Sequence, residues 1–249
     1  MSTGHLRPTA DDPAMVHRSG PSSPAPKRGL RVRWRADLVI VGSGLFLVLT
    51  IIAMVVFRGG ASYDLDADHY LFFGNYFSDL GGLRTYSGRD NVESRRFFTL
   101  ALVLVGSSVA LFGPTWRGWV RRRDTPVLGA TATLFAALSG LGFIAIAFAP
   151  WDRYLDTHDA IVRGTFGMLS AFIVCLSVIQ ARNGAARTFI GANVLYLVAL
   201  AGYGLVQLLG PSVDTRTGLQ IQVTVQKLIV YASILDLGLQ AWGVRSSRR

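Results

Sequence analysis

The sequence predicts an all-α fold: a six-transmembrane-helix bundle with an extended, partly helical first outer loop. Of its 249 residues, 51% are hydrophobic and 16% are charged, whereas soluble domains carry roughly 25% charged residues. Long uncharged runs recur along the chain, each of about 20 residues, which is the length that a helix needs to cross a bilayer. Short basic tracts adjoin these runs, a pattern that is typical of cytoplasmic loops.

The expected spans divide the chain into three parts. Residues 1–36 are Pro-, Ser- and Arg-rich and predict a disordered basic tail, residues 37–244 form the transmembrane domain, and residues 245–249 form a second basic tail. The first span is too long and too far from the N-terminus for a signal peptide, and Pro211 ends the fifth. The expected spans are Asp37 to Phe57, Phe97 to Phe112, Pro126 to Ala149, Ala160 to Gln180, Thr188 to Leu209 and Val223 to Val244.

The distribution of charge predicts the orientation. The side that holds the N-terminus carries 16 basic and four acidic residues, and the opposite side carries nine basic and ten acidic ones. By the positive-inside rule the basic side is cytoplasmic, so we expect a multi-pass protein of the cell (inner) membrane with both termini cytoplasmic. The net charge of +10 sits in tracts beside spans, without any nucleic-acid-binding module. We therefore expect membrane lipids, and no nucleic acid, as partners.

Metal and redox sites are not predicted. Cys175 is the single cysteine and lies in an apolar run, so it makes no intrachain disulfide and no redox motif. His69 and His158, with Asp79 and Asp156, lack the spacing of zinc ligands. We expect no metal and no cofactor.

The first polar group that topology does not explain is segment 75–94, expected on the outer face. Asn75, Ser78 and Asp79 follow an aromatic run there, and Asn91 comes later in the same segment. Asp79 is interpreted either as a carboxylate aimed into the mouth of the bundle or as part of a turn that caps a neighbouring helix.

The second group precedes the fourth span and holds Asp152, Asp156 and His158. Asp159 and Arg163 are four residues apart and should face each other on a helix. His158 suits a general acid or base or a hydrogen-bonded structural histidine, and both interpretations stay open.

The third group is Gln226-Lys227, in the first part of the last span. A lysine at that depth is costly unless it snorkels to the surface or finds a partner. Its depth fits a pair with Asp79, Asp152 or Asp156.

Asp236 follows nine residues after Lys227, about 13 Å deeper in the membrane. Its expected partners are Asn193, Gln240 and cytoplasmic arginines. It is interpreted either as a proton carrier or as a hydrogen-bonded carboxyl. Small residues also recur in the spans, where they favour close helix packing or leave room for a ligand.

In combination, these motifs resemble those of a family of uncharacterised bacterial six-helix membrane proteins, described as a domain of unknown function. Its layout is distantly similar to that of the damage-regulated autophagy modulator type. The resemblance covers roughly residues 37–243 and implies a six-helix membrane fold without an established activity. Asp236 and the basic tail depart from the family pattern. The segments that carry the resemblance are Asn75-Tyr-Phe-Ser-Asp-Leu-Gly81, Ser87-Gly88 with Asn91 and Ser94, Pro150 with Asp152, Tyr154-Leu-Asp156 with His158, and Gln226-Lys-Leu-Ile-Val-Tyr231 with Gln240.

The sequence is compatible with three functions and with one purely structural role of the charged cluster. The first is binding of a lipid headgroup or small polar ligand at the outer mouth. The second is a lipid hydrolase or transferase with Ser78 as nucleophile, His158 as base and Asp79 or Asp156 orienting it. The third is a proton-coupled transporter that uses Lys227 and Asp236. The structural alternative is a clasp that ties the fourth and sixth spans to the first outer loop. The ligand-binding set comprises Asn75, Asp79, Asn91, Asp152, Asp156, His158, Gln226 and Lys227.

Overall fold

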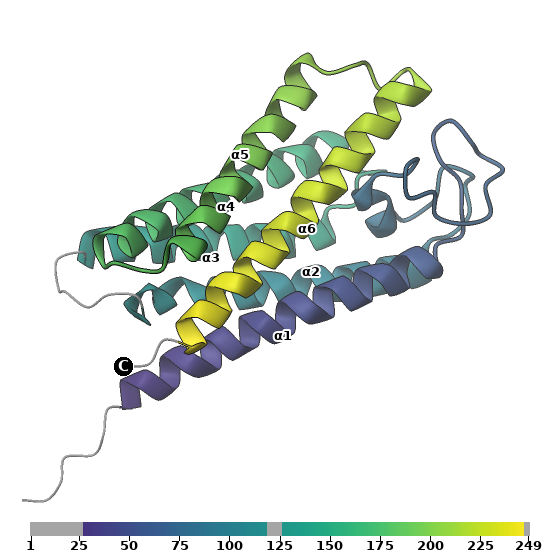
Figure 1. The fold of residues 1–249 in the computed structure, drawn as a ribbon. Coiled ribbons are helices and arrows are strands. Elements are labelled where there is room, and N and C mark those ends of the chain that lie inside the picture. The colour runs from purple at the N-terminus through teal and green to yellow at the C-terminus, as the bar shows by residue number, and fades with distance from the viewer. Residues whose placement is uncertain (1–26, 119–125, 247–249) are drawn as a thin grey trace, which may run out of the picture.

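The structure is a computed structural model that describes residues 27–118 and 126–246 (Figure 1). Over these residues it is all-helical, and six of its helices are long and apolar enough to cross a membrane. This confirms the predicted fold class. The long helices are α1 (Lys27–Val55), α2 (Val92–Phe112), α3 (Pro126–Phe148), α4 (Leu155–Arg182), α5 (Arg187–Leu209) and α6 (Arg216–Ser246), and the 3₁₀ helices are η1 (Phe77–Gly81) and η2 (Gly113–Gly118).

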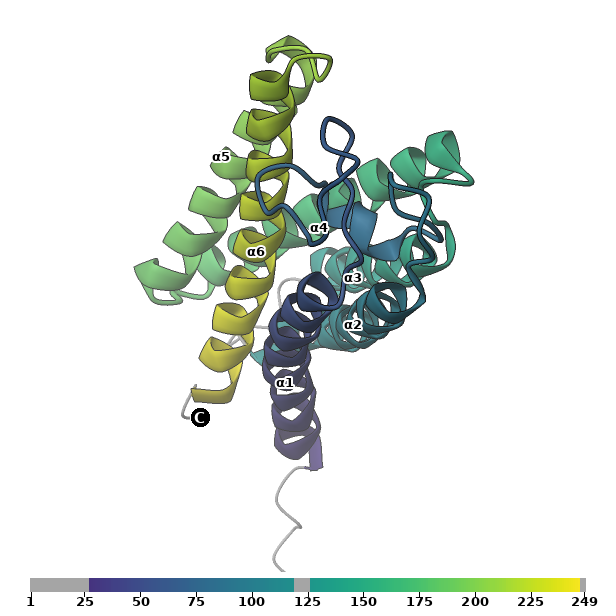
Figure 2. The ribbon, with the colours of Figure 1, turned by 90° about the vertical axis from the view of Figure 1, so that its right-hand side faces the viewer.

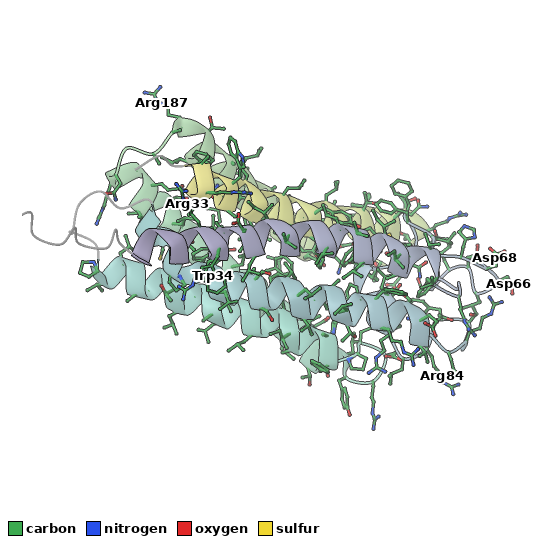
Figure 3. All side chains as sticks on the ribbon, turned by 90° about the horizontal axis from the view of Figure 1, so that it is seen from below. Arg33, Trp34, Asp66, Asp68, Arg84 and Arg187 are labelled. Carbon is green, nitrogen blue, oxygen red and sulfur yellow. The ribbon has the colours of Figure 1, made fainter. Side chains whose placement is uncertain are left out.

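The helices run back and forth between two ends of the molecule (Figure 1). The terminal end holds the start of α1 and the end of α6. The loop end holds residues 56–91, which contain η1, and the turn before α4. Figure 3 shows Arg33 and Arg187 at the terminal end, and Asp66 and Asp68 at the loop end.

The core lies where α1, α2, α3 and α4 pack together and α6 closes one side. Large aromatic side chains fill it, including Phe46, Phe112 and Phe172, each almost fully buried. Gly106 and Gly140 bring the backbones of α2 and α3 into contact, because a Cβ on either glycine would collide with the carbonyl of the other. At this pair, small residues favour packing, as expected in a membrane.

α5 lies at the periphery of the bundle. Its buried residues are Asn193 and Tyr196, both in the half near the terminal end. Toward the loop end, α5 and α6 diverge from α3 and α4, as both ribbon views show (Figures 1 and 2). Leu208, in the last turn of α5, is 81% exposed.

Several helices begin earlier than expected, and the difference is largest for α1 and α6, which were expected to begin at Asp37 and Val223. α1 begins at Lys27 and α6 at Arg216, so the predicted basic tail is helical from residue 27 onward. The polar residues of these segments, mainly Arg, Lys and Gln, are good helix formers, and no proline stops either helix where its apolar run ends. Residues 1–26 of that tail and residues 247–249 of the second lie outside the described part.

Candidate functional site at the loop end

Asn75 is the centre of the hydrogen bonding in the loop of residues 56–91, and it is fully buried. Its Oδ1 accepts a hydrogen bond from the backbone N–H of Leu71 at 3.0 Å. Its Nδ2 donates to the carbonyl of Gly60 at 2.9 Å and to Oδ2 of Asp79 at 3.0 Å. One side chain therefore joins three parts of the loop, which lies beside α6 over the middle of the bundle (Figure 2).

Asp79 is 3% exposed and points inward. Its Oδ2 also accepts a hydrogen bond from the backbone N–H of Tyr76 at 2.9 Å, which caps η1. Burial raises the pKa of Asp79 to about 7, against the lowering effect of the bonds from Asn75 and Tyr76 and of the Lys227 charge. Asp79 is thus buried, as the first interpretation requires, but it caps its own helix η1, whereas the second interpretation expected it to cap a neighbouring helix.

Lys227 of α6 has no exposed surface, so it does not snorkel. Its Nζ donates hydrogen bonds to the carbonyls of Asn75 and Val223, the latter at 3.2 Å. It also lies over the rings of Tyr70, at 5.5 Å, and Phe72, at 5.2 Å from their centroids. The charge is therefore held by backbone carbonyls and aromatic faces, both of which stabilise a buried cation.

Asp79 is the predicted carboxylate partner that interacts electrostatically with Lys227. The described residues contain no ion pair between them, and Asn75 links them instead. The neighbouring Gln226 accepts a hydrogen bond from the backbone N–H of Phe77 at 2.9 Å. Adjacent residues of α6 thus hold the start of η1.

Asp152 ties the turn before α4 to the same loop. Its carboxylate accepts hydrogen bonds from the backbone N–H groups of Leu83, at 3.0 and 3.1 Å, and of Arg84, at 3.0 Å. Asp159 and Arg163 approach to 3.8 Å on the exposed surface of α4, which confirms the predicted pair.

His158 does not meet its proposed catalytic partners. It is 5% exposed, and its Nδ1 donates a hydrogen bond to the carbonyl of Ala149 at 2.7 Å. Within residues 27–118 and 126–246 no hydrogen bond joins His158 to Ser78, Asp79 or Asp156. Ser78 is half-buried and Asp156 is exposed. In the same ranges no cluster of His, Cys, Asp and Glu is placed to hold a metal ion.

Asn91 closes the other end of η1. It is 1% exposed, and its Nδ2 lies 3.1–3.2 Å from the carbonyls of Asp79, Leu80 and Gly82. These carbonyls have no further helical turn to bond. Ser94 adds one hydrogen bond to Leu80, at 3.2 Å. Asn91 therefore has a structural role in this loop.

Replacing Asn91 with Ala is expected to lower the free energy of unfolding by about 1–3 kcal/mol, because buried carbonyls lose their donor. Thermal unfolding of the purified protein would measure the change. Ser94→Ala, which removes a single bond to the same helix, is the matched control and should have the smaller effect. Equal effects of the two variants would contradict the capping role of Asn91.

A further group at the loop end was not identified as a site from the sequence. Tyr76 of the loop interacts electrostatically with Tyr203 of α5 and Asp159 of α4. Burial, together with smaller contributions from Tyr203, Asp79 and Asp159, raises the pKa of Tyr76 to about 12. Gln207, one turn after Tyr203, donates a hydrogen bond to its hydroxyl. Tyr76, Tyr203 and Asp159 come from the loop, α5 and α4, so they are brought into one region by the fold and not by any sequence pattern.

In the comparisons with known proteins, no family model, no curated protein and no solved structure matches the chain. The resemblance to the uncharacterised six-helix family therefore stays a prediction.

Proposed function

We propose that the protein binds an amphiphile, with a lipid headgroup or similar polar group held at the loop end between α4 and α5. We further propose that it lies in the cell (inner) membrane with its termini in the cytoplasm and its loop end outside, because the basic residues gather at the terminal end. The observation that carries the proposal is the divergence of α4 and α5 beneath a cluster of polar side chains.

The contacts between α4 and α5 at the terminal end show which face of each helix is directed toward the other. There Asn193 of α5 donates to Ser177 of α4 at 2.9 Å. Asp159 precedes Ser177 by five turns, and Gly204 follows Asn193 by about three, so each lies on the face of its helix that meets the other. Yet a Cβ added to Gly204 would meet no atom within 4 Å. The surfaces that touch at one end are therefore not packed against each other at Gly204.

The polar groups near this region suit a zwitterionic headgroup. Asp159 offers a carboxylate for an ammonium group, and Arg163, 3.8 Å away, offers a planar donor for phosphate. Tyr76 and Tyr203 add hydroxyl groups from the loop and from α5. Apolar tails would lie along α5, whose Leu208 is largely exposed.

Five residues of the predicted ligand-binding set have a supporting role in this proposal. Asn75, Asp79, Gln226 and Lys227 fix the start of η1, and with it Tyr76. Asp152 fixes the loop to α4 from the other side. They form a clasp, defined by these five residues, that holds one wall of the site.

A pair of glycines on α5 tests the proposal. Gly204→Leu, on the face toward α4, is expected to reduce the phospholipid retained after purification by about tenfold, equal to about 1.4 kcal/mol of binding free energy. Native mass spectrometry would measure the retained lipid. Gly202→Leu is the matched control, because its Cβ also meets open space but lies on the opposite side of the helix.

Two outcomes would contradict the proposal: equal lipid retention in the two leucine variants, or a wild-type protein that carries no stoichiometric lipid. The hydrolase alternative lacks a hydrogen bond between Ser78 and His158 in the described residues. The transporter alternative lacks one between Lys227 and Asp236, which belong to separate hydrogen-bond networks. No specific observation favours either of them.

A further inference from the structure

A second polar network lies inside the membrane, toward the terminal end. Gln180 of α4 donates to Gln240 of α6 at 2.6 Å, and Asn193 of α5 donates to Gln180 at 3.0 Å. Gln240 in turn donates to Asp236 at 3.1 Å and to the carbonyl of Phe189 at 3.1 Å. The bond between Asp236 and its predicted partner Gln240 is thus confirmed. The network joins α4, α5 and α6.

Three buried oxygen atoms of this network have no hydrogen-bond partner: Oδ2 of Asp236, Oδ1 of Asn193 and the hydroxyl of Tyr196. Their side chains are 6%, 0% and 3% exposed. The orientation of Asn193 is fixed, because its Nδ2 already donates to both Ser177 and Gln180. Tyr196 lies on the same face of α5, one turn later, and interacts electrostatically with Asp236. Orphaned buried oxygens are rare and call for a partner.

In the part of the chain that the structure describes, no cation is paired with Asp236. The groups that interact with it from the helices packed around it are the amide of Gln240 and the phenol of Tyr196. α4 contributes only amide and hydroxyl groups to the network, and Arg245 pairs with Asp37 at 3.1 Å on the surface. A carboxylate ion without a cation is very costly in a membrane interior. A positive charge is therefore needed at this position.

We propose that Asp236, Asn193 and Tyr196 bind one small monovalent cation, Na⁺ or a proton. All three free groups are oxygens, which suit a hard cation, and a single carboxylate balances a single positive charge. Asn193 and Tyr196 are also the buried residues of α5. Cation binding thus holds α5 against α4 and α6, whatever occupies the loop end.

The experiment measures the midpoint of thermal unfolding of the full chain in detergent. All samples carry Asp79→Asn, which removes the titration of the other buried carboxyl. If the cation is Na⁺, the midpoint rises by about 2–4 °C when NaCl replaces N-methylglucamine chloride at equal ionic strength. If it is a proton, the midpoint instead rises by a similar amount as the pH falls from about 8 to about 5 in the absence of Na⁺.

Asp236→Asn should abolish either dependence, while Asp37→Asn, at an exposed paired carboxyl, should leave it intact. If Asp236→Asn does not fold, Tyr196→Phe removes one oxygen ligand only and should weaken the dependence. A protein whose midpoint responds to neither Na⁺ nor pH would overturn the proposal. The same conclusion follows if Asp236→Asn, or in its place Tyr196→Phe, responds as strongly as its parent.

Discussion

Replacing Lys227 with Met is expected to lower the free energy of unfolding by about 3–5 kcal/mol at a pH where Asp79 is ionised, because a buried charge then loses its compensation. Methionine fills a similar volume but donates no hydrogen bond. The carbonyl of Asn75 therefore loses its bond from Nζ, and the Asp79 carboxylate loses the positive charge that stabilises it. The hydrogen bond from Phe77 to Gln226 and the contact between the Phe77 and Tyr231 rings would still hold the start of η1 to α6.

The measurement is thermal or denaturant unfolding, combined with limited trypsin digestion at the arginines of the loop. Gln226→Leu, at the adjacent residue, removes one neutral hydrogen bond and should cost only about 1 kcal/mol. Adding Asp79→Asn to Lys227→Met should recover much of the loss, since no carboxylate is then left uncompensated. A Lys227→Met protein of unchanged stability that loses bound lipid would show that Lys227 contacts the ligand and is not part of a clasp.

The six helices could be predicted from the sequence because a bilayer leaves the backbone little choice. Each span must satisfy its own hydrogen bonds and must be apolar over about 20 residues. That requirement ends at the headgroups, so apolar runs do not locate the helix ends. α1 and α6 therefore continue into polar sequence at Lys27 and Arg216.

The peripheral position of α5 could not be predicted. Lipid tails are as apolar as neighbouring helices, so a leucine facing lipid and a leucine facing protein look the same in sequence. The polar and small residues of α5, rather than its apolar ones, indicate how it packs. Asn193 is the residue through which α5 bonds to α4, and Gly204 lies on the same face where contact has ended.

In the candidate site, sequence identified the charges but not their partners. The cost of burying Lys227 predicted that it must be compensated, and Asp79 was among the expected carboxylates. Much of the compensation comes instead from backbone groups, such as the carbonyl of Asn75. The carbonyl of Ala149 engages His158 in the same way. Every residue carries such groups, so no sequence pattern indicates which of them will lie within reach.

Asp79 makes the stability of the protein depend on pH. Its pKa is about 7 in the folded protein and 3.8 without burial, so between these values the folded state binds more protons than the unfolded one. The stability that Asp79 contributes is therefore greatest below about pH 4 and falls as the pH rises to about 7, above which Asp79 is ionised in both states. At 1.36 kcal/mol per pKa unit, the full change attributable to Asp79 is on the order of 4 kcal/mol.

Unfolding free energies measured across this range should thus decline in the wild-type protein. Asp79→Asn should remove the share of the decline that Asp79 contributes, because the amide keeps the acceptor oxygen but does not titrate, leaving at most the share that Asp236 contributes. Asp156→Asn, at an exposed carboxyl near the same end of the molecule, is the control and should leave the slope unchanged. In Lys227→Met the decline should extend to higher pH, since the charge that lowers the pKa of Asp79 is gone. A slope that is as steep in Asp79→Asn as in the wild-type protein would contradict this assignment and separate the clasp from the pH dependence.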